Sequence, residues 1–124
     1  MTAQFPYSLP QVIIPAGQAV SNAVLIGSGV IVGIIIPAAW TAAQLTFLVS
    51  LDGVNYYQMV DSTGTNVVSV NTPTINTFVA VAHFELFRGA IYIQLQSGTT
   101  AAQVNQTLAA QITLVIDKSV MGGF

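Results

Sequence analysis

Apolar and polar residues alternate with a period of two along most of the chain. In the segment LTFLVSL, Leu45, Phe47 and Val49 share one face, whereas Thr46 and Ser50 share the other. The segments AIYIQLQSG and TLAAQITLVI alternate in the same way. Because successive side chains of a strand point to opposite sides of a sheet, this period predicts strands with one buried face.

Clusters of turn-forming residues separate these segments at short, regular intervals. Asp52-Gly53 follows the first strand named above, Asp61 to Thr65 forms a second cluster, and Pro73 interrupts a third. No long amphipathic helix is predicted. About eight short strands with this spacing are typical of an antiparallel β-sandwich of the jelly-roll type, and a closed barrel would show similar patterning. The predicted strands lie around residues 11–14, 23–26, 30–36, 45–51, 56–60, 67–70, 77–81, 91–96 and 107–116.

One stretch, VIVGIIIPAAW, is almost wholly apolar and departs from the alternation. A membrane-spanning helix needs about 20 apolar residues, and this run is shorter and contains Gly33 and Pro37. Its Val and Ile residues favour a strand. We therefore predict a strand from Val30 to Ile36 that is covered on both faces, by a second sheet or by a neighbouring subunit. The candidate residues for an oligomer or capsid interface are Val30, Val32, Ile34, Ile36 and Trp40.

The length of 124 residues is that of one ordinary domain. We predict a single β-sandwich domain over residues 1–124, with an irregular N-terminal segment at about 1–10 and a short C-terminal tail at about 117–124. Either end could be flexible or could act as an arm that docks on a neighbour.

Composition indicates contacts between chains. Hydrophobic residues make up 53% of the sequence and charged residues only 5%, against roughly 25% charged residues in an average soluble domain. A core of this size does not hide so much apolar surface, so part of it is expected to lie at an oligomer interface. Arg88 and Lys118 are the only basic residues, which argues against nucleic acid as a partner because such binding depends on clustered basic residues.

The sequence contains no cysteine, which excludes disulfides, thiolate metal sites and cysteine nucleophiles. The first residues, MTAQFPYSLPQ, lack the basic and apolar regions of a secretory signal. We therefore expect synthesis in the cytoplasm and no membrane anchor.

Catalytic chemistry has few candidates. His83 is the only histidine, so a Ser-His-Asp triad would need it as the base, with Asp52, Asp61 or Asp117 orienting it. Asp52 and Asp61 lie in predicted turns, where aspartate is common for its local hydrogen bonds. The expectation is that the protein is not an enzyme.

Other polar and aromatic residues also have ordinary structural explanations. Glu85 and Arg88 are spaced to pair with each other in one helical turn. A calcium site at Asp52 and Asn55 lacks the oxygen-rich spacing of a dedicated loop, so no metal and no cofactor is expected. Four aromatic residues could stack on sugar rings if they emerged on one face, although packing is the ordinary role of such residues: Trp40, Tyr56, Tyr57 and Tyr92.

Three segments carry a resemblance to a known group of proteins. The sequences LPQVIIPAGQAVSNAV, IPAAWTAAQLTFLVSLDGVNYYQMVDSTG and FRGAIYIQLQSGTTAAQVNQTLAAQITLVI resemble small β-sandwich structural proteins of tailed bacteriophages. Residues 37–40, 45–53 and 90–99 carry the match. The resemblance implies a capsid decoration or cement protein that binds the major capsid protein, commonly as a trimer. It also implies a location on the virion after assembly in the host cytoplasm.

The hairpin motif of residues 47–56 is also similar to that of discoidin-like, galactose-binding sandwiches. That resemblance implies an alternative function, a carbohydrate-binding module of a phage fibre or tail tip. A shared fold does not by itself carry function across.

Overall fold

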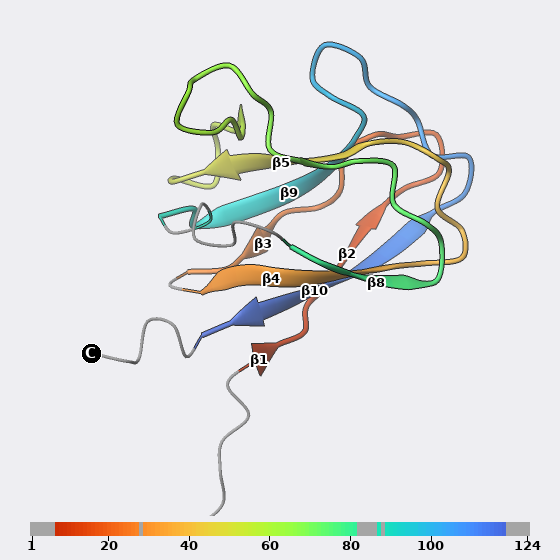
Figure 1. Cartoon of the computed structure of the whole chain (residues 1–124), viewed down its shortest axis with the longest axis horizontal. Helices are drawn as coiled ribbons and strands as arrows, with labels where there is room; N and C mark the ends of the chain where they lie inside the picture. Colours follow the sequence, from red (N-terminus) through yellow and green to blue (C-terminus); the bar gives the residue numbers. More distant parts are fainter. Residues whose placement is uncertain (1–6, 28, 82–86, 88, 119–124) are drawn as a thin grey trace, which may run out of the picture.

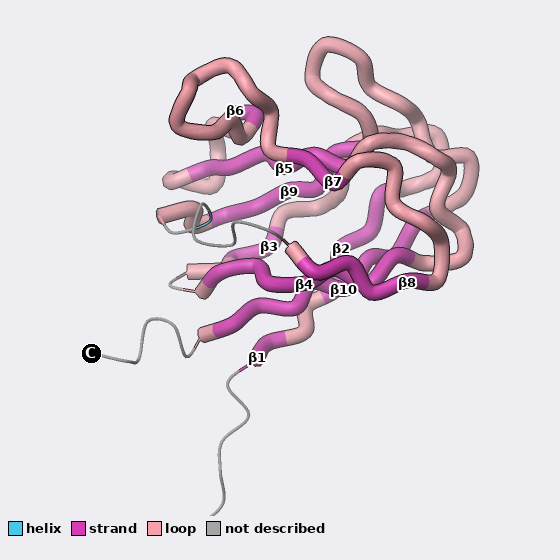
Figure 2. The backbone as a smooth tube through the Cα atoms, in the orientation of Figure 1, coloured by secondary structure: helices cyan, strands magenta, loops and turns pink. Residues whose placement is uncertain are grey.

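The computed structural model describes residues 7–27, 29–81, 87 and 89–118, which form ten short strands in two antiparallel sheets. The sheets pack face to face as a β-sandwich (Figures 1 and 2). The predicted all-β sandwich is therefore confirmed, and the strands form two separate sheets rather than one closed barrel.

The first sheet, called sheet A, is built around β10, which pairs with β4 on one side and with β1 and β2 on the other. β8 pairs with β4 and forms the opposite edge. The strands of sheet A are β1 (Tyr7–Ser8), β2 (Gln11–Ile14), β4 (Val30–Ile36), β8 (Thr77–Ala80) and β10 (Ala110–Asp117).

The second sheet, called sheet B, is built around β5 and β9, which pair along their whole length. β3 pairs with β9, and the two short strands β6 and β7 follow each other along the far side of β5. The strands of sheet B are β3 (Val24–Leu25), β5 (Leu45–Ser50), β6 (Tyr57–Gln58), β7 (Ser69–Val70) and β9 (Tyr92–Ser97).

The core lies between the two sheets and contains the alternate apolar residues of both. Phe47 of β5 and Phe87 meet edge to face, with 4.9 Å between ring centroids, a preferred geometry for aromatic pairs. The other fully buried large side chains are Ile14, Ile31, Ile34, Ile36, Leu45, Ile93, Leu95, Ile112, Leu114 and Ile116. The fold therefore builds a dense apolar interior within one chain.

The predicted strand positions agree with the structure in most places, with differences at the ends. β4 spans the predicted residues, Val30–Ile36. Within the segment expected to be irregular, Tyr7–Ser8 form β1 because they pair with Ile116 and Asp117. The tail predicted to start at 117 begins one residue later in the described part of the chain, because Asp117 still belongs to β10.

A buried glutamine joins three loops at one end of the sandwich. The side chain of Gln106 is fully buried; its Oε1 accepts a hydrogen bond from the Thr41 N–H (2.7 Å), and its Nε2 donates to the Thr41 carbonyl (3.1 Å) and to Ser97 Oγ (2.8 Å). Its main chain bonds to Gly17 and Gln18. Buried polar groups need such partners, so Gln106 fixes this end of the molecule.

Candidate assembly surface

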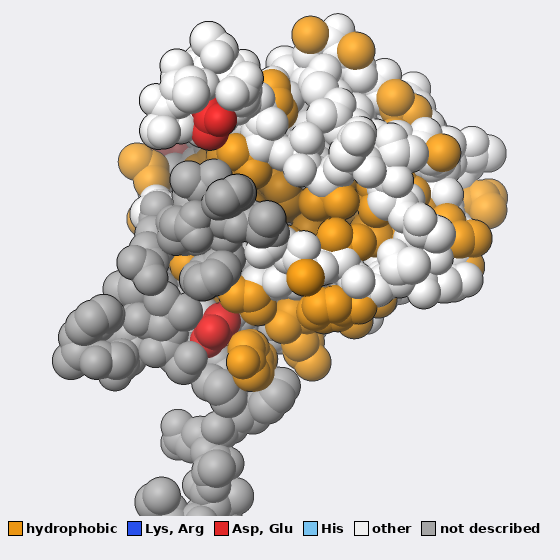
Figure 3. All heavy atoms as spheres, in the orientation of Figure 1, with side chains coloured by type: hydrophobic (Ala, Val, Ile, Leu, Met, Phe, Trp, Pro, Cys, Tyr) orange, Lys and Arg blue, Asp and Glu red, His pale blue; other side chains and the backbone are white. Residues whose placement is uncertain are grey.

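The outer face of sheet A, which points away from the core, carries exposed apolar side chains on β8 and β4 and a hydrogen-bonded polar group, Gln11, Gln111 and Thr113, on β2 and β10. Cross-strand pairing places Phe78, Ile35 and Thr113 side by side on β8, β4 and β10. Phe78 is 60% exposed and Ile35 is 42% exposed. Ile13 on β2 is also exposed, but it pairs with Gln111, so polar side chains of β10 and β2 lie between it and Ile35. We call Phe78 and Ile35 the apolar face, and Figure 3 shows apolar side chains gathered in this part of the molecule, around β8 and β10.

Phe78 lies flat on its own sheet because the neighbouring strand has a glycine beneath it. A side chain at Gly33 would collide with the ring of Phe78. The ring therefore folds over β4 and away from the outer edge of β8. This leaves the backbone edge of β8 uncovered by its own largest side chain.

A groove opens between the two sheets on the side where β7 and β8 form their edges. It has a volume of about 510 Å³, and Asp61 and Asn66 lie at it beside apolar residues. The apolar residues include Phe47 on β5 and Val79 and Val81 on the side of sheet A. Figure 3 shows apolar side chains in the hollow between the two layers. The sandwich is therefore not closed on this side by the described residues.

The five residues predicted for an interface mostly belong to the interior of this chain. Val30, Ile34 and Ile36 are at most 1% exposed and Trp40 is 5% exposed; of the five only Val32 is partly buried. A register shift beside Val115 allows β4 to bury two successive residues at its start. Two apolar side chains that are exposed on sheet A, Ile35 and Phe78, were not among the predicted residues.

The four aromatic residues considered for sugar stacking do not come together. Trp40 belongs to the core, and its Nε1 is buried without a hydrogen-bond partner among the described residues. Tyr57 lies opposite Val49, whereas Tyr92 lies opposite Ser50. Because neighbouring positions of β5 face opposite ways, Tyr57 and Tyr92 are on opposite faces of sheet B. Tyr56 is partly buried.

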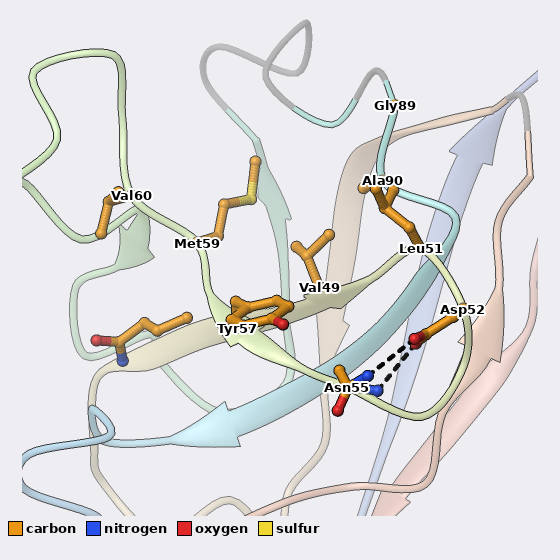
Figure 4. A pocket seen from close by; sticks show the side chains of 10 residues that line it. Val49, Leu51, Asp52, Asn55, Tyr57, Met59, Val60, Gly89 and Ala90 are labelled. Carbon is orange, nitrogen blue, oxygen red and sulfur yellow. Dashed lines mark hydrogen bonds between the residues drawn. The ribbon is translucent and has the colours of Figure 1, made fainter.

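A second hollow, of about 610 Å³, lies beside β6 (Figure 4). Tyr57, which is 69% exposed, lines it together with Met59, Asp52 and Asn55. The Asp52 carboxylate accepts hydrogen bonds from the main-chain N–H groups of Asn55 and Val54 and from the Asn55 side chain. These bonds, the one from the Asn55 N–H first, hold the pKa of Asp52 well below its usual 3.8. Asp52 is thus an ionised turn residue and not a proton donor at neutral pH.

The remaining candidates for chemistry are dispersed. Asp61 bonds with Thr63, whose hydroxyl is the main reason that the pKa of Asp61 is lowered. Asp117 is the last residue of β10. His83, Glu85 and Arg88 lie outside the described residues.

The described residues contain no group of three or more His, Cys, Asp or Glu side chains placed to hold a metal ion. They also contain no helix long and apolar enough to cross a membrane.

Comparison with known proteins found no match to any family model, to any curated protein or to any solved structure.

Proposed function

We propose that this chain is a non-enzymatic structural protein of a bacteriophage virion, a capsid decoration or cement protein that binds the major capsid protein and stabilises the shell as a homo-oligomer. One observation carries the assembly part of this proposal. The fold builds a buried core within a single chain, yet Phe78 and Ile35 remain exposed side by side on sheet A.

The composition of this surface supports a protein partner. Charged side chains among the described residues are few: Asp52 and Asp61 lie in turns beside sheet B, whereas Asp117 and Lys118 lie at the end of β10 in sheet A. The cores of permanent protein interfaces are depleted in charge and enriched in aromatic residues, and contiguous exposed apolar patches commonly mark such sites. The apolar face has these properties.

The virion and the major capsid protein enter the proposal through the sequence resemblance alone. The segments that carry the resemblance form the turn after β4 and most of β5 and β9. These segments therefore support the choice of protein class because they form strands and a turn of the sandwich. The same resemblance favours a trimer.

The first test is the solution mass of the purified protein. We expect a stable oligomer of a 13.0 kDa chain, and Ile35→Lys should weaken it because the charge would be buried at the centre of the apolar face. Leu25→Lys is the matched control, since Leu25 is 61% exposed on β3 of the other sheet. A parent protein that stays monomeric at high concentration would contradict the assembly proposal.

The second test uses phage particles. Cryo-EM of the intact virion should show the protein on the capsid surface, and particles without it should lose their genome at a lower temperature. Density only at a fibre or tail tip, together with binding to host glycans that Tyr57→Ala removes, would instead support the carbohydrate-binding alternative.

A further inference from the structure

We infer that the edge of β8 is a homotypic contact, at which β8 of one chain pairs antiparallel with β8 of a second copy about a two-fold axis through Val79. Sheet A would then continue across two chains. The inference rests on the homo-oligomer part of the proposed function but gives a two-fold contact in place of the trimer that the resemblance favours, and it does not depend on which shell the protein binds.

The outer side of β8 offers unused backbone groups. The Val81 N–H donates to the Val32 carbonyl directly opposite (3.0 Å), and backbone groups alternate in direction along an antiparallel strand. The N–H and carbonyl groups of Thr77 and Val79 therefore also point towards β4, whereas those of Phe78 and Ala80 point outwards. No hydrogen bond of these outward groups is found in the described part of the chain.

Pairing elsewhere in the sheet supports this assignment. The Leu114 N–H donates to the Pro10 carbonyl, so the backbone groups of Leu114 point towards β2 and those of Thr113 point towards β4. Ile35 pairs with Thr113, so its backbone groups must point towards β10. The backbone groups of Ile34 then point towards β8 and Val79. The hydrogen bonds at β8 and at β10 thus give the same outward direction for the backbone groups of Phe78 and Ala80.

This edge lacks the features by which proteins ordinarily prevent edge-to-edge pairing. Protected edges carry lysine, proline, inward charges or bulges. The sequence of β8 is Thr-Phe-Val-Ala, and its register with β4 is regular throughout. The edge is therefore competent to accept another strand.

The two outward residues lie symmetrically about Val79, which selects both the partner and the register. With Val79 on the two-fold axis, Phe78 of each chain pairs with Ala80 of the other, so all outward groups of both residues are used. On the outer face, the large side chain of Phe78 then lies beside the small side chain of Ala80 of the other copy. Shifting the register by one pair would oppose Phe78 to its own copy, or would leave outward groups without partners.

The same arrangement accounts for the open groove between the sheets. Val79 points inwards and lines that groove with Phe47 and Val81. A second copy would bring its own Val79 and its own groove to the same place, so that each chain would cover the groove opening of the other. Asp61, at the groove, is held within its own turn by Thr63. A two-fold contact pairs the same edge of both chains, and the outward backbone groups of β8 can pair with their own copies in this way.

The first experiment is a cysteine scan, which is clean because the sequence has no natural cysteine. In the inferred register Val79 faces its own copy as a non-hydrogen-bonded pair, for which Cα atoms are about 4.5 Å apart, within the range of about 4.4–6.8 Å that disulfides span. Val79→Cys should form a covalent dimer on mild oxidation. Ala80→Cys and Phe78→Cys are the matched controls, and neither should do so.

A proline substitution tests the backbone pairing. Ala80→Pro removes an N–H that points outwards, so the folded chain should keep its circular dichroism spectrum while the dimer dissociation constant rises by about 100-fold or more. Val79→Pro is the contrasting variant, because it removes a hydrogen bond to β4 and should destabilise the fold itself.

The outcomes separate this inference from the proposed function. A two-fold contact predicts an even number of chains. A trimer that Ala80→Pro leaves intact, or a Val79→Cys variant that does not cross-link, overturns the β8 contact but leaves the virion proposal standing. A dimer that is linked through β8, formed by a protein that is not found on the virion, would support the β8 contact and overturn the virion proposal.

Discussion

Replacing Gln106 by alanine tests how much one buried amide contributes to the stability of the sandwich. Its side chain is fully buried, forms hydrogen bonds to both main-chain groups of Thr41 and to Ser97 Oγ, and joins the end of β9 to the loop after β4. The main-chain bonds of Gln106 with Gly17 and Gln18 do not depend on the side chain. The substitution therefore removes the side-chain bonds alone.

The expected cost follows from these contacts. Each net hydrogen bond contributes about 1 kcal/mol, and a buried partner left unsatisfied costs about 1–3 kcal/mol. Thr41 is only partly buried, so water can replace part of what its backbone groups lose. Gln106→Ala should thus lower the free energy of unfolding by about 2–4 kcal/mol.

Urea unfolding followed by tryptophan fluorescence measures this loss directly. Trp40 is the only tryptophan and is 5% exposed, so its emission reports unfolding of the core. The protein concentration must be the same for all variants because self-association contributes to apparent stability. Gln103→Ala is the matched control: Gln103 is exposed in the same loop, and its loss should change the free energy by no more than about 0.5 kcal/mol.

A Gln106→Ala variant as stable as the Gln103→Ala control would refute this reasoning. It would mean that the loops at this end of the molecule are held by their main-chain bonds and that the amide adds nothing to them.

Three further predictions concern other parts of the chain. Gly98 and Gly64 both have a positive φ (82° and 81°), but a Cβ at Gly98 would collide with the main chain of Ala102, whereas a Cβ at Gly64 would meet open space. Gly98→Ala should therefore lower the urea midpoint more than Gly64→Ala. Equal effects would show that backbone strain alone matters. Asp52 has a lowered pKa in the folded state, so its stabilising contribution is complete above 3.8 and is lost as the pH falls below that value; Asp52→Asn should show a smaller loss of stability on acidification, and an unchanged acid response would contradict this. Trp40→Ala should cost about 3–5 kcal/mol in unfolding followed by circular dichroism, and a much smaller loss would show that Trp40 does not anchor the core.

The alternating pattern was sufficient to predict the sandwich and most of its strands. It predicted the location of β4 because six of its seven residues are Val or Ile, which favour strands, and it predicted the turn at Asp52 because Asp-Gly is a local turn signal. Local signals do not tell which side of a strand meets the core. β4 is apolar on both sides, so the exposure of Ile35 became evident only from its pairing with Phe78 and Thr113.

The buried glutamines were also beyond the reach of sequence patterns. Gln106 lies among small polar residues that predict a loop, and its burial depends on Thr41, which is 65 positions away. Gln96 alternates as an outward residue of β9, yet it is only 1% exposed because Thr46, Gln58 and Thr100 all bond to its side-chain oxygen. Contacts between residues so distant in sequence leave no periodic trace.

The two outer faces of the sandwich reverse the usual pattern in different ways. On sheet B, polar side chains such as Thr46 and Gln96 point outwards but are buried and satisfied by other parts of the same chain. On sheet A, Phe78 and Ile35 point outwards, are apolar and remain exposed. Burying a hydrogen-bonded polar group within one chain needs no partner, whereas covering exposed apolar surface would lower the free energy of an assembly. The exposed pair on sheet A is therefore a surface on which association would be favourable, and β8 is the edge at which its backbone can continue into a second copy.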